Sequence, residues 1–316
     1  MELHIPVMLN EVISGLNIKS DGVYVDCTLG RAGHSSEILK RIPNGRLIAF
    51  DQDIKAIEES NQFLKTISNN YTLIHDNFIN LRKHLDRLNI SKVDGILMDL
   101  GVSSPQFDDG ERGFSYRYDA RLDMRMDQDA TLDAHYIVNN YDLKDLVRIF
   151  KDYGEENYAY PIARNIVMKR SIKSIDTTFE LVDIIKSSLP KKELAKKGHP
   201  AKQVFQALRI ETNHELDYLT NVLNDALKSL KVGGRLAIIT FHSLEDRIVK
   251  KAFKEVSEVE GNRHAPVLLP SEEKRPSYHL VNRQVITASE EELEYNPRSK
   301  SAKLRIIERI DENDER

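Results

Sequence analysis

The sequence predicts an α/β fold in which a mostly parallel sheet is interrupted by a large helical insertion. In the first hundred residues, four short apolar runs alternate with segments of helical periodicity. This alternation is typical of a parallel sheet that is covered by helices on both faces. The alternation stops near residue 105, and no convincing strand follows before residue 214. The sheet is therefore expected to contain chain from both sides of the insertion.

Five core strands are expected because each is a short, β-branched apolar run that ends in a turn or a polar residue. They span residues 23–26, 46–50, 71–75, 95–98 and 235–241. The leucines of residues 216–227 fall on one face of an expected helix, and a Gly-Gly turn at 233–234 leads into the fifth strand. Residues 284–288 and 304–310 are expected to pair as an antiparallel hairpin at the sheet edge.

The insertion carries helix start and stop signals instead of strand signals. Thr177 and Glu180 form a T-x-x-E capping box before an apolar stretch that Pro190 ends. Asp142 is expected to cap another helix, and residues 158–170 to form a third. These signals predict two domains, one made of residues 1–104 and 215–316 and the other of residues 105–214.

Composition limits the classes of function. The chain has 316 residues with a net charge of −4 and a single cysteine, Cys27, so disulfides and cysteine-based zinc sites are excluded and no metal site is expected. No apolar run reaches the roughly 18 residues that a membrane-spanning helix needs. Neither membrane association nor a signal peptide is indicated, and the expected location is the cytoplasm.

Charge is unevenly distributed along the chain. Residues 160–210 contain eleven Lys or Arg and four Asp or Glu, whereas residues 290–294 and 311–316 are acidic. The basic stretch is either a solvated helical surface or a contact surface for nucleic acid.

The turn after the first strand has the features of a cofactor site. Gly30 and Gly33 would let the backbone approach a ligand before a helix N-terminus. Asp51 ends the second strand, where an acidic residue can accept both ribose hydroxyls. Its neighbour Asp53 is expected instead to cap the following helix. Because the full G-x-G-x-x-G is absent, a pyrophosphate-containing dinucleotide such as NAD is disfavoured relative to S-adenosylmethionine.

Polar and aromatic residues follow the other strands. Phe78 lies after the third strand and Asp99 closes the fourth, so both are expected near the same crevice beyond the strand ends. Residues 241–247 and 296–299 are two further polar segments expected on this side.

The segment after the fourth strand limits which atom of a base could be methylated. No cysteine lies there to add to a pyrimidine ring, so C5 methylation is disfavoured. Ser103-Ser104-Pro105 loosely resembles the S-P-P-[WY] loop of amino methylases, but it lacks the second proline and the aromatic residue. The residue that stacks on the base would then be Phe107, Phe205 or Phe241, each of which also has an alternative role in core packing.

Longer motifs resemble the ribosomal RNA small subunit methyltransferase H family (MraW) over nearly the whole chain. The most specific are DLGVSSPQ at 99–106, LDMRMD at 122–127 and FHSLEDRIVK at 241–250. The remaining matches are residues 4–8, 26–35, 51–53, 111–115, 153–156, 199–201, 205–207 and 296–298. The resemblance implies a class I (Rossmann-like) methyltransferase with an inserted RNA-recognition domain.

The resemblance also implies a reaction and a set of site residues. The expected activity is S-adenosyl-L-methionine-dependent N4-methylation of cytidine 1402 of 16S rRNA in the small ribosomal subunit. The expected cofactor-binding residues are Ala32, Gly33, His34, Asp51, Phe78, Asp99 and Gln106. The residues expected to line the target are Asp99, Ser103 and His242. The alternatives are a non-catalytic RNA-binding assembly factor and, less favoured, an NAD-dependent dehydrogenase; monomer and homodimer both remain open.

Overall fold

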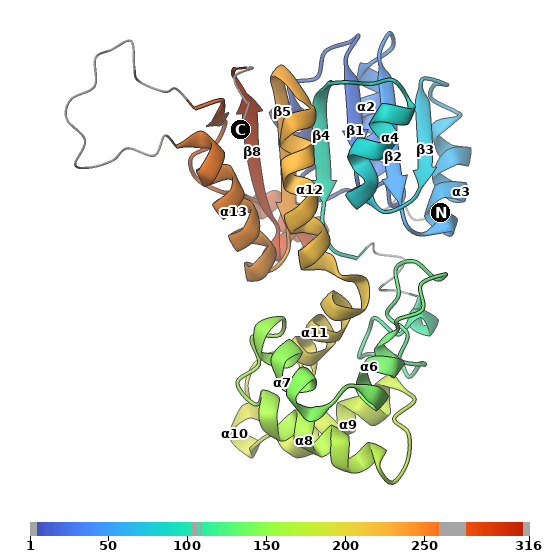
Figure 1. The fold of residues 1–316 in the computed structure, drawn as a ribbon, viewed down its shortest axis with the longest axis vertical. Helices are drawn as coiled ribbons and strands as arrows, with labels where there is room; N and C mark the ends of the chain where they lie inside the picture. The colour runs from blue at the N-terminus through green and yellow to red at the C-terminus, as the bar shows by residue number, and fades with distance from the viewer. Residues whose placement is uncertain (1–4, 103–106, 108, 259–275, 312–316) are drawn as a thin grey trace, which may run out of the picture. The chain divides into compact units, whose positions relative to one another are not determined.

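The computed structural model describes residues 5–102, 107, 109–258 and 276–311. The chain divides into two compact units (Figure 1). We call residues 1–101 with 216–316 the sheet unit, and residues 102–215 the helical unit. Each has its own hydrophobic core of buried side chains.

The sheet unit contains a mostly parallel sheet, as the sequence predicts. Its strands run in the order β3-β2-β1-β4-β5-β8-β6, with β7 paired to β8. The first five are parallel in the Rossmann-like order, and β8 adds antiparallel to β5. The strands are β1 (Val23–Asp26), β2 (Arg46–Asp51), β3 (Tyr71–His75), β4 (Val93–Asp99), β5 (Leu230–Thr240), β6 (Tyr278–Leu280), β7 (Ile286–Thr287) and β8 (Lys303–Arg309).

Helices cover both faces of this sheet, as Figure 1 shows. Alternate residues of one strand enter different cores: Tyr24 packs on the face that carries α1, α2 and α3, and Val25 packs on the face that carries α4, α12 and α13. The helices are α1 (Leu9–Leu16), α2 (Gly33–Arg41), α3 (Ile54–Leu64), α4 (Leu81–Arg87), α12 (Glu215–Ser229), α13 (Ser243–Ser257) and α14 (Glu290–Tyr295), with short 3₁₀ turns η1 (Phe78–Asn80) and η3 (Pro297–Ser301).

Two details of the sheet differ from the sequence-based expectation. The fifth strand starts at Leu230 rather than Arg235, because the Gly-Gly turn lies inside an irregular strand that shifts register against β4. The strand β6 was not predicted, since three residues are too short for a periodic signal. The expected pairing of residues 284–288 with 304–310 is confirmed as β7 with β8, although β8 lies inside the sheet.

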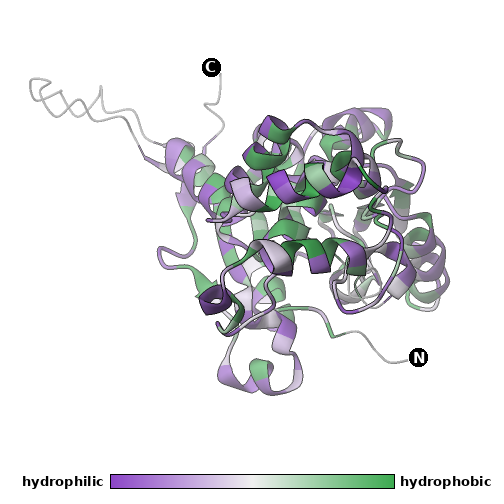
Figure 2. Cartoon of the chain, turned by 90° about the horizontal axis from the view of Figure 1, so that it is seen from below, coloured by the Kyte–Doolittle hydropathy of each residue, from purple (hydrophilic) through white to green (hydrophobic). Residues whose placement is uncertain are grey.

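The helical unit is built from short amphipathic helices whose apolar stripes enclose one core, and Figure 2 shows these green stripes beside hydrophilic purple surfaces. The caps at Asp142 and at Thr177 with Glu180 are confirmed, the latter as a complete capping box. The helices are α6 (Ala134–Asn140), α7 (Leu143–Asp152), α8 (Ala159–Arg170), α9 (Thr178–Ser188), α10 (Lys191–Leu194) and α11 (Lys202–Asn213), with the 3₁₀ turn η2 (Gly110–Arg112).

A long loop before α6 is held together by the side chains of Arg112, from the motif at 111–115, and Asn213, which bond the backbone of the motif at 122–127. The buried Arg112 guanidinium donates to the carbonyls of Arg125 (2.9 Å) and Met126 (3.2 Å). Asn213 bonds the carbonyl of Met124 and the amide of Met126, both at 2.8 Å. These two side chains therefore satisfy buried backbone groups, which explains their chemistry without a ligand.

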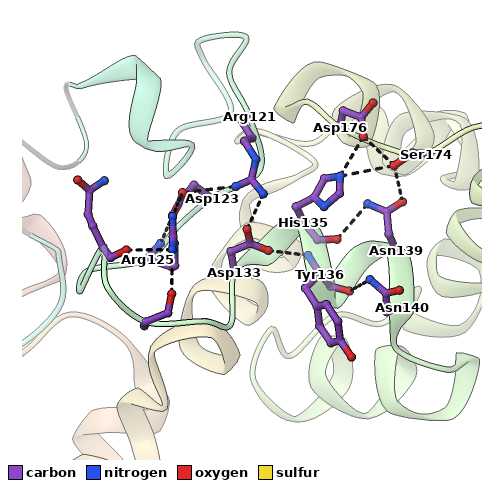
Figure 3. A network of polar contacts seen from close by, with 12 residues as sticks. Arg121, Asp123, Arg125, Asp133, His135, Tyr136, Asn139, Asn140, Ser174 and Asp176 are labelled. Carbon is purple, nitrogen blue, oxygen red and sulfur yellow. Dashed lines mark hydrogen bonds and ion pairs between the residues drawn. The ribbon is translucent and has the colours of Figure 1, made fainter.

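A serine, a histidine and an aspartate meet beside this loop, as Figure 3 shows. His135 Nε2 lies 2.9 Å from Asp176 Oδ1 and 3.5 Å from Ser174 Oγ, and Ser174 donates to Asp176 at 2.7 Å. A nucleophile triad needs the aspartate on one ring nitrogen and the serine on the other. Because both reach Nε2, this cluster is a structural network.

Gly113 offers a test of how tightly the loop is packed. It has φ +71°, and an added Cβ would lie 2.3 Å from the Arg121 carbonyl oxygen. We expect Gly113→Ala to lower the free energy of unfolding in urea by at least about 2 kcal/mol, because strain and a backbone clash combine. Gly198→Ala is the control, since Gly198 has φ +112° but no neighbouring atom within 4 Å. Equal losses for the two variants would contradict the packing argument.

Within the part of the chain that the structure describes, no helix combines the length and the apolar character that crossing a bilayer requires.

Candidate cofactor-binding and catalytic site

The carboxyl ends of β1 and β4 are joined by a buried hydrogen-bond chain. Asp26, which ends β1, accepts from the Thr28 amide (3.0 Å) and from Ser35 Oγ on α2 (2.7 Å). Thr28 Oγ1 in turn accepts from the amide of Asp99, which ends β4, at 2.7 Å. Burial raises the pKa of Asp26, and the Ser35 hydrogen bond opposes that rise. The two strand ends that were expected to share a crevice are thus directly connected.

The turn after β1 depends on unusual backbone conformations. Gly30 and Ala32 both have positive φ, +49° and +59°. An alanine in the left-handed region costs roughly 1–2 kcal/mol, and the Ala32 methyl is fully buried. Ala32 is the N-cap position of α2, and both of its backbone groups are bonded: its amide donates to the Leu29 carbonyl (2.8 Å) and its carbonyl accepts from the Ser36 amide (2.8 Å).

Gly33 has a packing reason to be glycine that the sequence motif did not reveal. A Cβ there would lie 2.4 Å from Pro6 Cγ. The segment around Pro6 thus rests directly on the turn that opens α2.

His34 is buried next to Asp99. Its Nε2 donates to the Val7 carbonyl at 2.9 Å, and its Nδ1 lies 3.7 Å from Asp99 Oδ2. Burial lowers the pKa of His34 despite the opposing charge of Asp26. The ring is therefore neutral at pH 7 and turns an acceptor nitrogen toward Asp99.

Asp51 holds the first turn from the end of β2. Its Oδ2 accepts from the Gly30 amide (2.8 Å) and its Oδ1 from the Asp53 amide (2.8 Å). Burial raises the pKa of Asp51 to about 6, although both hydrogen bonds oppose the rise. Each carboxylate oxygen has a second lone pair, so the capacity to accept ribose hydroxyls remains.

Two neighbouring positions behave differently from each other. Asp53 caps α3 by accepting from the Lys55 amide at 3.0 Å, which confirms its expected structural role. Phe78 is half-buried and is the first residue of η1. The side chain of Asn77 caps this turn. The ring packs partly on the core, which leaves part of it for contact with a ligand.

Asp99 carries the clearest sign of an unfilled interaction in the described residues. Its side chain is 23% exposed, yet its Oδ1 is buried with no hydrogen-bond partner. Burial, and then the charges of Asp26 and Glu245, raise the pKa of Asp99 well above its ordinary value. A buried acceptor without a donor is costly, so this oxygen is suited to a donor supplied by a bound molecule.

His242 has a structural role besides the catalytic one that the sequence suggested. It is the N-cap of α13, where its Nδ1 accepts from the Glu245 amide at 3.5 Å. Glu245 completes a capping box by accepting from the amides of Phe241 (2.9 Å) and His242 (3.3 Å). The motif FHSLEDR thus begins a helix, which sequence reasoning missed because histidine is an uncommon cap.

The remaining expected site residues divide into three groups. Ser103 and Gln106 lie outside the described residues. Phe205 is 4% exposed in the core of the helical unit, and Phe107 packs against that same core. Phe241 packs in the sheet unit, where its Cδ2 would lie 3.6 Å from a Cβ placed on Gly101.

The polar segment at 296–299 clamps the N-terminal part of the chain. Asn296 Nδ2 donates to the Ile5 carbonyl (3.3 Å), and buried Glu292 accepts from the Met8 amide (2.8 Å) and from Ser299 Oγ. This segment therefore has a structural role, and its expected place on the same side as the crevice stays a prediction. The buried glutamate gave no signal in the sequence because it lies in an acidic run of the kind that is usually solvated.

The whole-chain comparison decides the family. The model of the MraW methylase family matches residues 1–310. The chain belongs to the MraW methylase family. Proteins named ribosomal RNA small subunit methyltransferase H are similar to this MraW methylase throughout. The one from Exiguobacterium sibiricum is 52% identical over 310 residues, covering 98% of this chain and 99% of that protein. The one from Spiroplasma kunkelii is 53% identical over 311 residues, covering 97% and 98%.

Among solved structures, a putative rRNA methylase from Clostridium thermocellum aligns with this MraW methylase at a TM-score of 0.46 and 14% identity, covering 98% of this chain and 100% of that one.

Proposed function

We propose that this chain uses S-adenosyl-L-methionine to methylate N4 of cytidine 1402 in 16S rRNA of the small ribosomal subunit. The observation that carries the proposal is the hydrogen-bonded junction of β1 and β4, where Asp99 keeps a buried acceptor without a donor. Membership of the MraW methylase family and the names of the 50–53% identical relatives support methylation of small-subunit rRNA, and the N4 atom and position 1402 are proposed from the resemblance of the motifs.

The residues at the strand ends fit this cofactor. Asp51 would accept the ribose hydroxyls, Phe78 would contact the adenine, and the turn around Ala32 and Gly33 would face the amino-acid part. Among the described residues of this turn no lysine or arginine is placed to neutralise a pyrophosphate except Arg31, which pairs with Glu59. When bound, the sulfonium supplies an electrophilic methyl group and a positive charge that nearby carboxylates stabilise.

Asp99 would act on the nucleophile. The exocyclic amino group of cytosine is weakly nucleophilic, because its lone pair is delocalised into the ring. An acceptor at Asp99 Oδ1 would bond an N–H and favour a pyramidal nitrogen in line with the methyl group. The bound cofactor would supply the methyl group, and the amino nitrogen would release one proton to solvent in exchange. Ser103 and His242 are the other residues proposed to line the target.

One experiment tests the reaction and the position together. Small subunits from a strain that lacks this gene are incubated with the protein and with cofactor labelled in its methyl group, and the modified nucleoside is identified by mass spectrometry. We expect N4-methylcytidine at position 1402. Methylation at another atom or base would contradict the proposal, and cofactor binding without methyl transfer would favour the non-catalytic assembly factor.

The helical unit is proposed to bind the RNA through four exposed lysines, Lys191, Lys192, Lys196 and Lys197, which we call the lysine cluster. Reversing all four charges should weaken RNA binding and flatten its dependence on salt. Each lost phosphate contact lowers the slope of log affinity against log salt by roughly 0.7 for a single strand. The slope is measured by RNA binding at several salt concentrations.

The matched control for this prediction reverses Lys250 and Lys251 on the exposed side of α13. Reversing these two charges should leave the slope of log affinity against log salt nearly unchanged. If the lysine cluster variant keeps the wild-type slope, these lysines serve only to solubilise the unit. Lys196 is expected to contribute least of the four, because it already pairs with Glu193 at 2.6 Å.

A further inference from the structure

Two rings from distant parts of the sequence stack at the surface of the helical unit. Tyr116 and His199 have ring centroids 4.1 Å apart and an interplanar angle of 5°. Beneath them, buried Phe205 meets Tyr116 edge-on at 5.7 Å. The stack is thus anchored in the core, while Tyr116 and His199 themselves are only half-buried.

The backbone fixes which nitrogen of His199 can reach a ligand. Its Nδ1 accepts from the Ala201 amide at 3.3 Å, just before α11 begins. In the neutral ring the proton therefore lies on Nε2. The structure gives Nε2 no hydrogen-bond partner among the residues that it describes. A half-buried stacked ring therefore presents one oriented N–H donor.

The charges around this donor are positive. Lys186 on α9 and Arg117, next to Tyr116 in sequence, are both exposed, and these are the charged groups whose fields act on the His199 ring. Burial and then these two charges lower the pKa of His199. A fixed donor on a ring that lies in the field of two cations matches an anion with several acceptor oxygens, such as a phosphodiester.

We propose that His199 Nε2, Lys186 and Arg117 bind a backbone phosphate of the RNA substrate, with Tyr116 positioning the imidazole by stacking. This site rests on the proposed function, which supplies the RNA, and it is separate from the lysine cluster. Protonation would take place at Nδ1 and displace the long (3.3 Å) hydrogen bond from the Ala201 amide. A bound phosphate would stabilise the imidazolium by more than this loss, so RNA binding would be accompanied by proton uptake at His199. Arginine and lysine would supply contacts that do not titrate in this range.

The test measures RNA affinity without cofactor between about pH 5.5 and about pH 8, where histidine titrates and a phosphodiester does not. Wild-type affinity should rise as the pH falls, by about tenfold if binding raises the pKa of His199 by one unit. His199→Gln keeps an amide donor but cannot titrate, so that its affinity should change less with pH. The control is His279→Gln, an exposed histidine of β6, which should behave as wild type.

A pH dependence in His199→Gln equal to that of wild type would overturn the proposal. If this variant does not fold, Lys186→Gln decides, since loss of one phosphate contact should lower the salt slope by roughly 0.7 and an unchanged slope would again overturn the site. Methyl transfer by the wild-type protein is measured in parallel. If transfer occurs while both variants bind RNA as wild type, only this site is wrong; if no transfer occurs, the proposed function itself fails.

Discussion

Replacing Asp51 with asparagine should weaken binding of S-adenosyl-L-methionine by about 100-fold. Hydrogen bonds to a charged group contribute about 1.5–3 kcal/mol each, and the ribose would donate two. Asparagine is preferable to alanine, because its single carbonyl oxygen still accepts from one of the two amides that Asp51 bonds, those of Gly30 and Asp53, whereas alanine would leave both without an acceptor. Isothermal titration calorimetry measures the change in dissociation constant.

The matched control is the neighbouring carboxylate. Asp53→Asn should leave cofactor affinity unchanged, because asparagine caps a helix about as well as aspartate. If the Asp51 and Asp53 variants lose affinity equally, the ribose role of Asp51 is wrong.

The pH dependence of the same binding has a defined sign. The pKa of Asp51 is raised to about 6, so the carboxyl gains a proton as the pH falls through that value and loses acceptor capacity. Cofactor affinity should therefore decrease below about pH 6 in the wild type, and less so in Asp51→Asn. In the cofactor-free protein the same raised pKa makes ionisation unfavourable, so this group's contribution to stability falls as the pH rises from 3.8 towards 6.

Asp99→Asn should reduce kcat by about 100-fold or more while changing cofactor affinity by much less. The amide removes one acceptor from the position proposed to bond the target amino group, and loss of one such preorganised contact costs about 10²–10³ in rate. Single-turnover transfer of labelled methyl groups to small subunits measures the step. Asp51→Asn should show the opposite pattern, a large loss of affinity with less change in rate at saturating cofactor.

Two outcomes for the Asp99 and Asp51 variants would contradict this assignment. Asp99→Asn with a wild-type rate would remove Asp99 from the reaction, and an equal loss of affinity in both variants would make it a binding residue only. Circular dichroism checks that each variant is folded.

The parallel strands were predictable because each is a buried apolar run that ends in a polar residue. Asp26, Asp51 and Asp99 follow from that pattern, since strand ends of a parallel sheet meet at one edge. What could not be predicted is which hydrogen bonds connect these strand ends. The bond from the Asp99 amide to Thr28 Oγ1 joins residues 71 apart in sequence, and no local signal specifies it.

Two residues show why motif spacing alone gives an incomplete account. The glycine at 33 matches a ligand-binding turn, yet its missing side chain makes room for Pro6. His242 lies in a polar segment that suggests catalysis, yet its ring caps α13. In both cases the spacing is correct, and the contact that explains it comes from packing that only the folded chain reveals.

The clamp on Ile5 and Met8 has a consequence for how the protein is made. The turn that opens α2 is braced by residues near the start of the chain, which are in turn held by Glu292 and Asn296, almost three hundred residues later. A chain still emerging from the ribosome would lack that brace until residue 296 had been synthesised and released from the exit tunnel. The turn that is proposed to hold the methyl donor would thus be completed among the last events of biosynthesis, well after the helical unit has been made.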